Sequence, residues 1–383
     1  MEKFRCERCG NEDLRFTGIR NGKRYCRKCI SFQGNLADTS FVCKEGLGLS
    51  LKYPLSDKQK EVSDKVVSIL SQKRNVLIHA VTGAGKTELV YQAMENALKE
   101  RGHVGFATPR KDVVIDLLPR IKEAFPQADV VSVYGGHTFS LEGDIILLTT
   151  HQLYRYRQYF DLLILDEIDA FPYKDNDVLN HFFYDAVRGN YVLLSATPSK
   201  SDIDHIEKDN GEVVSLFERY HKGKLPEPVF IQHSSVLQRV AVLRLLKKYQ
   251  EERKPVFVFS PEIEEGRNLF FFLRRFYQNG AFVSSKEDSR RLDIEKFKTH
   301  ELDYLVTTSI LERGVTVKNL QVIVYMADNV IYDSATLIQI AGRVGRKMDA
   351  RDGDVIFLGR ESSPEIEEAI YEIKRYNRKA HLL

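Results

Sequence analysis

The sequence predicts an α/β protein with two tandem parallel-sheet domains behind a small cysteine-bearing module. Short apolar runs alternate with helical stretches twice along the chain, as expected for parallel strands that are buried on both faces. Four of the five cysteines form two close pairs near the N-terminus, where apolar periodicity is weak. We therefore expect four segments: a module over 1–52, domains over 53–222 and 223–361, and a C-terminal helix over 362–383.

The apolar runs of each α/β region are the expected strands of its sheet. In the first region they lie at 75–80, 104–108, 130–134, 145–150, 162–166 and 191–196. In the second region they lie at 229–232, 256–260, 282–284, 304–308, 322–326 and 355–358. Two prolines and a glycine at 223–228 predict a linker between the regions. The C-terminal helix could pack on the second domain, dock a partner or lie on a membrane surface.

Composition bounds the class of protein. A chain of 383 residues is too long for one compact core, and a net charge of +3 excludes a protein-wide basic field. Residues 1–52 are locally basic, with 11 Lys plus Arg against 6 Asp plus Glu. No run of about 18 apolar residues predicts a transmembrane helix, and no signal peptide is expected. We expect a cytoplasmic protein, with a peripheral position at the inner face of the membrane as an option, and paired cysteines that bind metal. The oligomeric state cannot be predicted.

A phosphate-binding loop is predicted after the first strand. The segment AVTGAGKT at 80–87 follows an apolar strand and precedes a helical stretch, the context that such a loop needs. Backbone N–H groups would surround phosphate oxygens, Lys86 would contact the β and γ phosphates, and the Thr87 hydroxyl would bind Mg²⁺. The expected nucleotide-binding residues of the loop are Thr82, Gly83, Ala84, Gly85, Lys86 and Thr87.

Two carboxylates end the strand at 162–166, and ligands bind at such carboxyl ends of strands in α/β sheets. Asp166 is expected to hold Mg²⁺, and Glu167 to orient or deprotonate the attacking water. Small hydroxyl residues end the next strand. Ser195 and Thr197 could hydrogen-bond the acidic residues and couple nucleotide state to the rest of the domain.

Arginines in the second region complete the predicted ATP site. Arg343 and Arg346 are spaced by three, which predicts that they share one face of a helix. A guanidinium delivered from a second domain would stabilise the charge on the transferred phosphoryl group.

Candidate nucleic-acid contacts follow other strand ends or open turns, where backbone N–H and hydroxyl groups suit phosphates. His151 could instead be a packed histidine. The candidates are Thr108, Pro109, Arg110, Gly135, Thr150, His151, Gln152, Thr307 and Thr308.

The spacing of the cysteines matches a structural zinc site. Cys6 and Cys9 form one pair, and Cys26 and Cys29 form the other, with 16 residues between the pairs. Unmetallated thiols and an iron–sulfur cluster are the alternatives. Basic and aromatic residues interleave in this module, which is typical of a surface for single strands. The other interpretation is a module that docks on a partner or on the core formed by the two α/β domains.

These motifs, in this order, resemble those of superfamily 2 helicases over residues 53–360. The resemblance implies two RecA-like domains, Gln59 as an adenine contact, and nucleotide and nucleic-acid contacts from 307–316, including Gly314. The DEID sequence at 166–169 and Gln339 in place of a His both favour a class other than DEAD-box RNA helicases.

A closer resemblance is to the ComFA family, carried by TTHQL at 149–153, FDLLILDEIDAFPY at 160–173 and ILERGVT at 310–316 behind four cysteines. It implies a single-stranded-DNA-stimulated ATPase in DNA uptake, beside a membrane DNA channel and a phosphoribosyltransferase-like competence partner. An RNA helicase, or a zinc-bearing nucleic-acid adaptor with a regulatory ATP site, are the rival interpretations. ATP, Mg²⁺ and Zn²⁺ are the expected cofactors.

Overall fold

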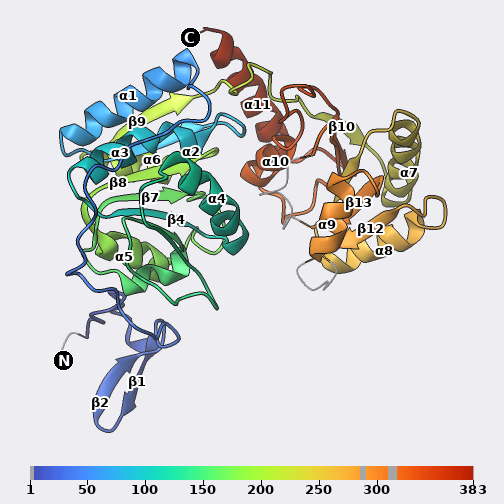
Figure 1. The fold of residues 1–383 in the computed structure, drawn as a ribbon. Helices are drawn as coiled ribbons and strands as arrows, with labels where there is room; N and C mark the ends of the chain where they lie inside the picture. Colours follow the sequence, from blue (N-terminus) through green and yellow to red (C-terminus); the bar gives the residue numbers. More distant parts are fainter. Residues whose placement is uncertain (1–3, 285–289, 309–316, 383) are drawn as a thin grey trace. The chain divides into compact units, whose positions relative to one another are not determined.

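The protein forms two compact units, each built around one parallel sheet (Figure 1). The computed structural model describes residues 4–284, 290–308 and 317–382. The first unit comprises Met1–Ala80 and Lys86–Leu216, and the second comprises Val81–Gly85 and Phe217–Leu383. Both sheets confirm the predicted α/β class with two parallel-sheet domains.

The first sheet has seven strands in the order β5-β6-β4-β7-β8-β3-β9, all parallel. Every predicted strand of this region is present, and an edge strand that was not predicted follows them. The strands are β3 (Val76–Ala80), β4 (Val104–Thr108), β5 (Val130–Val133), β6 (Ile145–Thr149), β7 (Phe160–Asp166), β8 (Val187–Ser195) and β9 (Glu212–Leu216). All residues of β3, β4 and β6 are buried, as expected for strands covered on both faces.

Helices cover both faces of this sheet. One face carries α5 (Asp177–Ala186), α6 (Lys200–Lys208) and the 3-10 turn η2 (Thr150–Arg155). The helices α1 (Asp57–Ser71), α3 (Tyr91–Lys99) and α4 (Lys111–Ala124) pack against the other. The four-residue α2 (Lys86–Leu89) follows β3 and leads into α3.

The second sheet has six parallel strands in the order β10-β15-β14-β11-β13-β12. Its strands are β10 (Val229–Gln232), β11 (Val256–Phe259), β12 (Gly280–Val283), β13 (Tyr304–Thr307), β14 (Gln321–Val324) and β15 (Val355–Gly359). Its helices are α7 (Ser235–Glu251), α8 (Ile263–Leu273), α9 (Arg290–Lys298), α10 (Ser334–Ala341) and α11 (Pro364–Leu382).

The C-terminal helix α11 packs within the second unit. Ile366 and Ile373 are buried, and the Tyr376 ring stacks on Phe217 with 5.2 Å between centroids. The Asn377 side chain accepts from the Leu225 N–H at 2.8 Å and donates to the Leu225 carbonyl at 2.9 Å. Of the three roles that the sequence left open, packing on the second domain is therefore the one observed. No helix among the described residues is long and apolar enough to cross a membrane.

The N-terminal module belongs to the first unit and contains η1 (Leu14–Phe16) and a hairpin of β1 (Thr17–Arg20) and β2 (Lys23–Cys26). Neither strand was predicted from the sequence. The second half of the module runs along the first unit before α1 begins. Its backbone N–H groups donate to Arg155 from Ala37 and to Ala124 from Ser50. The segment between them therefore ties the module to the α/β core.

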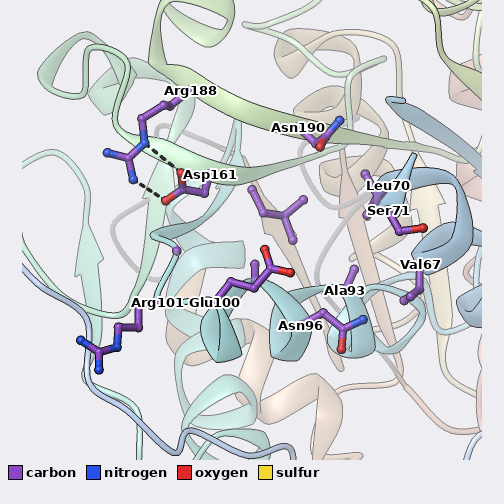
Figure 2. A pocket seen from close by; sticks show the side chains of 13 residues that line it. Val67, Leu70, Ser71, Ala93, Asn96, Glu100, Arg101, Asp161, Arg188 and Asn190 are labelled. Atoms are coloured by element: carbon purple, nitrogen blue, oxygen red, sulfur yellow. Dashed lines mark hydrogen bonds and ion pairs between the residues drawn. The ribbon is translucent and has the colours of Figure 1, made fainter. Parts of the chain in front are cut away.

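A cluster of charged residues anchors the start of β7, at the opposite end of the strand from Asp166 (Figure 2). The Asp161 carboxylate accepts from the His103 backbone N–H and from Arg188 Nε, both at 2.8 Å. Burial alone would raise the pKa of Asp161, but hydrogen bonds from His103 and Arg188 outweigh it and hold that pKa well below its usual range. Asp161 and Arg188 also border a cavity of about 340 Å³ between the strand starts and α1 and α3.

We expect Asp161→Asn to destabilise the first unit by about 1–2 kcal/mol at neutral pH, since solvent partly screens this pair. The depressed pKa means that the charged carboxylate contributes stability above about pH 4, its unfolded value. That contribution is lost as the pH falls through the folded value. The difference between wild type and variant in urea midpoint should therefore be constant near neutral pH and shrink in acid. The exposed Asp204→Asn is the control. Equal midpoints for wild type and Asp161→Asn at pH 7 would contradict this account.

Candidate nucleotide and nucleic-acid site

Six predicted site segments meet at one edge of the first sheet. Because all strands are parallel, their carboxyl ends lie along the same edge. The neighbouring strands β7, β8 and β3 end at Asp166, at Ser195 and at the phosphate loop. The other three, β5, β6 and β4, lead into the turn at Gly135, into η2 and into Pro109–Arg110. The order of the strands thus separates nucleotide candidates from nucleic-acid candidates along one edge.

The phosphate loop has the backbone that its glycines permit. Gly83 and Gly85 have φ values of 83° and 79°, a region that other residues rarely adopt. Lys86 and Thr87 begin α2, and Thr87 is buried. A turn with left-handed glycines ahead of a helix start directs backbone N–H groups toward an anion. The loop therefore has the local form required for phosphate binding.

The acidic turn after β7 is held by a local network. Asp166 Oδ1 accepts from the Glu167 backbone N–H at 2.8 Å, and Glu167 has a φ of 59°. A left-handed glutamate costs about 1–3 kcal/mol of strain and is typical of functional turns. Thr197 Oγ1 donates to Asp169 Oδ2 at 2.8 Å, and the Thr197 N–H donates to Ser195 Oγ at 2.9 Å. The turns after β7 and β8 are therefore physically connected.

The nucleic-acid candidates of the first unit differ in exposure. Gly135 is exposed, and Arg110 is the N-cap residue of α4. Thr108 and Thr150 are completely buried, and their hydroxyls have no hydrogen-bond partner among the described residues. Contacts at these two positions would therefore come from the backbone or follow a local movement. The His151 ring stacks on Phe32 of the module at 6.1 Å, and its partial burial lowers its pKa.

The structure corrects the placement of the two arginines. We predicted Arg343 and Arg346 on one face of a helix, but α10 ends at Ala341 with Gly342 as its C-cap. The chain turns there, and Gly345 has a φ of 69°, so both arginines lie in a turn beyond the helix. Arg343 is buried, and Arg346 Nε donates to the Gly342 carbonyl at 3.0 Å.

Arg219 is a residue that the sequence analysis missed. It is 1% exposed, and its guanidinium donates to the carbonyls of Gly342, Val344 and Gly345 at 2.8–3.1 Å. Its Nε also donates to the carbonyl of Thr82 at 3.2 Å. Thr82 belongs to the second unit, as Arg219 does. Burial lowers the pKa of Arg219, and the charge of Arg346 acts in the same direction. Arg219 therefore fixes the turn that carries Arg343 and Arg346.

Three further predicted residues have distinct surroundings. Gln59 is buried, and its amide oxygen accepts from the Ser56 backbone N–H in a capping box at the start of α1. Thr307 and Thr308 are buried at the end of β13. Gly314 lies outside the described residues, as does the rest of segment 309–316.

The four N-terminal cysteines form a cluster that fits a metal ion. The Cys6 and Cys29 sulfurs lie 3.6 Å apart, as do those of Cys9 and Cys26, and all four lie within 4.8 Å of one another. A zinc ion bound at about 2.3 Å by four thiolates would place them about 3.8 Å apart. Burial raises the pKa of Cys9 to about 11, so a bound cation would favour the thiolate form of this sulfur.

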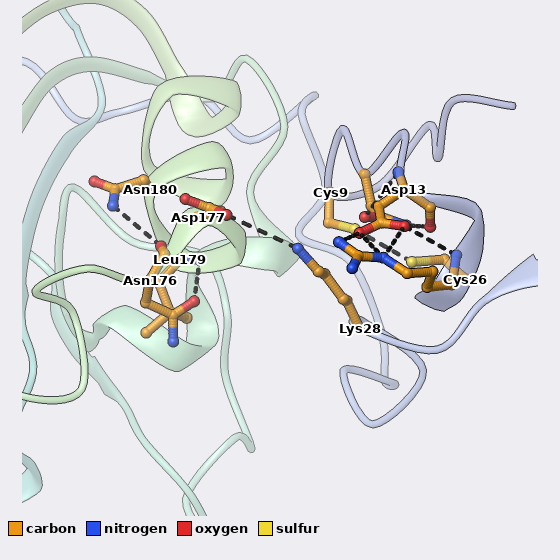
Figure 3. Close-up of polar contacts among 10 residues, drawn as sticks. Cys9, Asp13, Cys26, Lys28, Asn176, Asp177, Leu179 and Asn180 are labelled. Carbon is orange, nitrogen blue, oxygen red and sulfur yellow. Dashed lines mark hydrogen bonds and ion pairs between the residues drawn. The ribbon is translucent and has the colours of Figure 1, made fainter. Parts of the chain in front are cut away.

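The N-terminal module is docked on the first unit. Phe32 packs edge-on against Phe182 and Tyr154, at 5.0 and 5.7 Å between ring centroids. Lys28 forms an ion pair of 3.8 Å with Asp177 at the start of α5 (Figure 3). Arg155 Nη1 donates to the Asn35 carbonyl at 2.6 Å. Docking on the motor core, one of the two roles expected for the module, is therefore observed.

Comparisons with known proteins define the class. Residues 52–200 match the family described as "Type III restriction enzyme, res subunit", and residues 238–348 match "Helicase conserved C-terminal domain". The solved structure of S. cerevisiae Dbp5 bound to RNA and ADP BeF3 is 16% identical, with a TM-score of 0.63 over 84% of this chain and 91% of that one. The helicase MrfA bound to DNA is 13% identical, with a TM-score of 0.60 over 91% and 57%. These two likenesses show the fold alone. The family matches define a superfamily 2 helicase-type ATPase, a class of enzyme that uses ATP and Mg²⁺.

The relatives narrow this class to one family. The competence protein ComFA of Bacillus subtilis is 34% identical over 98% of this chain and 86% of its own length. ComFA of Streptococcus pneumoniae is 32% identical over 99% and 92%. The helicase RecG of S. pneumoniae is a more distant relative, 23% identical over 78% of this chain and 48% of its own. The chain belongs to the ComFA family.

We expect metal analysis of the purified protein to give one zinc per chain, because four sulfurs occupy every tetrahedral position. Cys26→Ala should remove the ion and lower the melting temperature of the module, while Cys43→Ala leaves the zinc content unchanged. Cys43 is a matched control because it is buried outside the cluster. Iron with visible absorption would show an iron–sulfur cluster instead, and full folding without any metal would contradict the zinc assignment.

Proposed function

We propose that this protein is an ATP- and Mg²⁺-dependent translocase that single-stranded DNA stimulates and that acts in the uptake of transforming DNA. The observation that carries the motor part is the shared carboxyl edge of the first sheet. There the strands leading to nucleotide candidates lie directly beside those leading to nucleic-acid candidates. The names of the two competence relatives support DNA as the polymer.

The residues of the nucleotide half suit phosphoryl transfer. Lys86 would neutralise the β and γ phosphates, while Thr87 and Asp166 would hold Mg²⁺. Bound Mg²⁺ neutralises charge that develops on the phosphates. Glu167 would accept the proton of the attacking water, and its left-handed backbone places it in a strained turn of the kind found at functional sites.

Arg343 and Arg346 would stabilise the charge on the transferred phosphoryl group. Arg219 donates hydrogen bonds to three backbone carbonyls of the turn that carries these two arginines. The backbone from which their side chains extend is therefore fixed. An arginine supplied in this way accelerates phosphoryl transfer by about 10³–10⁵ in related chemistry. The proposal therefore requires both arginines to reach the nucleotide held by the phosphate loop during turnover.

Coupling between the two halves follows from strand adjacency. The strands β4 and β7 pair in register up to Ala107 and Leu165, directly before Thr108 and Asp166. Thr197 then links the turn after β8 to Asp169. A change in conformation of the acidic turn on ATP hydrolysis can therefore reach the candidate nucleic-acid contacts after β4 through the neighbouring backbone.

The family also suggests where the enzyme works. We extend the proposal to a cytoplasmic position beside a membrane DNA channel, with a phosphoribosyltransferase-like competence protein as partner. Incoming single-stranded DNA would be the substrate that this motor moves.

Steady-state ATP hydrolysis with an oligo(dT) strand, a matched duplex and a matched RNA tests the proposal. We expect single-stranded DNA to raise turnover several-fold more than either alternative. Lys86→Ala should abolish hydrolysis, and Arg346→Ala should lower it by about 10³-fold because transition-state charge is left unpaired. The exposed Arg275→Ala on the second unit is the control for loss of an arginine.

Three outcomes would contradict the proposal. Stronger stimulation by RNA would favour an RNA helicase. Turnover unchanged by Lys86→Ala would remove the phosphate loop from catalysis. DNA binding without any hydrolysis would favour an adaptor with a regulatory ATP site.

A further inference from the structure

The hairpin of the N-terminal module has a regular geometry. Its strands β1 and β2 are antiparallel and pair Gly18 with Tyr25 and Arg20 with Lys23. Asn21 and Gly22 connect them with φ values of 51° and 75°, as in a type I′ turn, which suits the twist of two-residue hairpins. The positions of side chains on its two faces are therefore well determined by the register.

One face of this hairpin combines an aromatic ring with two cations. Residues two apart on a strand share a face, so Gly18, Arg20, Lys23 and Tyr25 lie together. We call this set the hairpin face. A Cβ on Gly18 would come within 2.7 Å of the Tyr25 ring, which shows that the ring lies against the Gly18 backbone. Tyr25 is 36% exposed, so solvent reaches part of a ring that the backbone supports from behind.

The cations of the hairpin face are available to a ligand. Arg20 and Lys23 are exposed, and neither has an acidic partner among the described residues. Residues 17–28 contain five Lys or Arg and no Asp or Glu. Lys28 is paired with Asp177, but the cations at Arg20 and Lys23 lack such a carboxylate among the described residues and can attract phosphates.

A different part of the module is occupied by its contacts with the first unit. Phe32 stacks on His151 and packs against Tyr154, and Arg155 holds the Asn35 carbonyl. These contacts attach the module to η2, the turn that follows β6 and contains nucleic-acid candidates. The hairpin projects from the rest of this unit in Figure 1. The module that carries the hairpin face is therefore attached to the same unit as the nucleic-acid candidates of η2.

We propose that the hairpin face is a second contact for the single strand of DNA that the motor moves. A base stacks on the Tyr25 ring, and Arg20 and Lys23 bind the adjoining phosphates. Aromatic stacking combined with cations is how proteins bind single strands without reading their sequence. The identity of the polymer rests on the proposed function, whereas the location of the contact rests on the hairpin itself.

The test measures binding of the full-length, zinc-loaded protein to fluorescein-labelled oligo(dT) by anisotropy, without ATP, over a range of salt. Tyr25→Ala should weaken binding about ten-fold, and Tyr25→Phe should keep near wild-type affinity because stacking is preserved. Replacing both Arg20 and Lys23 by Ala should reduce the slope of log affinity against log salt by about 1.4, since each single-strand phosphate contributes about 0.7.

Arg24→Ala is the matched control for Arg20→Ala. It removes the same charge from the same hairpin, but Arg24 pairs with Ile19 on the other face. We expect less than a two-fold change in affinity for this control. Zinc content is measured for every variant, and if Tyr25→Ala loses zinc, the double variant of Arg20 and Lys23 decides the outcome.

The results separate this inference from the proposed function. Wild-type affinity and salt slope in zinc-loaded hairpin-face variants, with turnover still stimulated by DNA, would overturn the hairpin contact and favour a protein partner there. The motor proposal would stand in that case. Wild-type protein that neither binds oligo(dT) nor responds to it in ATP turnover would instead overturn the proposed function.

Discussion

Parallel pairing of the strands in the first sheet is the constraint on which the site depends. Crossover connections, most of them helical, return each strand in the same direction, so every strand of this sheet ends at the same edge. The strand interiors are apolar and buried, whereas polar residues occupy the ends of β4, β6, β7 and β8. The polar side chains therefore lie in a row along the carboxyl edge of a buried apolar sheet. The order of the strands decides which of these side chains are neighbours.

Two buried arginines hold irregular segments of the chain in place by hydrogen bonds to backbone carbonyls. Arg219 binds the carbonyls of the turn that carries Arg343 and Arg346, and Arg155 binds a carbonyl of the N-terminal module. Guanidinium groups suit this role because one planar group can satisfy several carbonyl oxygens at once. These hydrogen bonds fix the backbone of segments that have no regular secondary structure.

Much of the architecture could be predicted because apolar runs and glycine-rich turns are local signals. The runs at 104–108 and 229–232 coincide with strands β4 and β10, and the phosphate loop has its expected left-handed glycines. The edge strand β9 was missed because its Glu212 and Ser215 interrupt the apolar pattern. The hairpin was missed although its Asn21–Gly22 turn is a recognisable signal, because β1 and β2 are short and polar. Arg219 could not be found, since its partners are backbone carbonyls more than 120 residues away.

The proposed motor requires that nucleotide binding and DNA binding are coupled, and a coupling between two ligands is reciprocal. The most direct test is isothermal titration of oligo(dT) with and without a non-hydrolysable ATP analogue, and of the analogue with and without oligo(dT). The account predicts that each ligand changes the affinity of the other by the same factor, about five-fold or more. Affinities that are unchanged by the other ligand in both directions would contradict it.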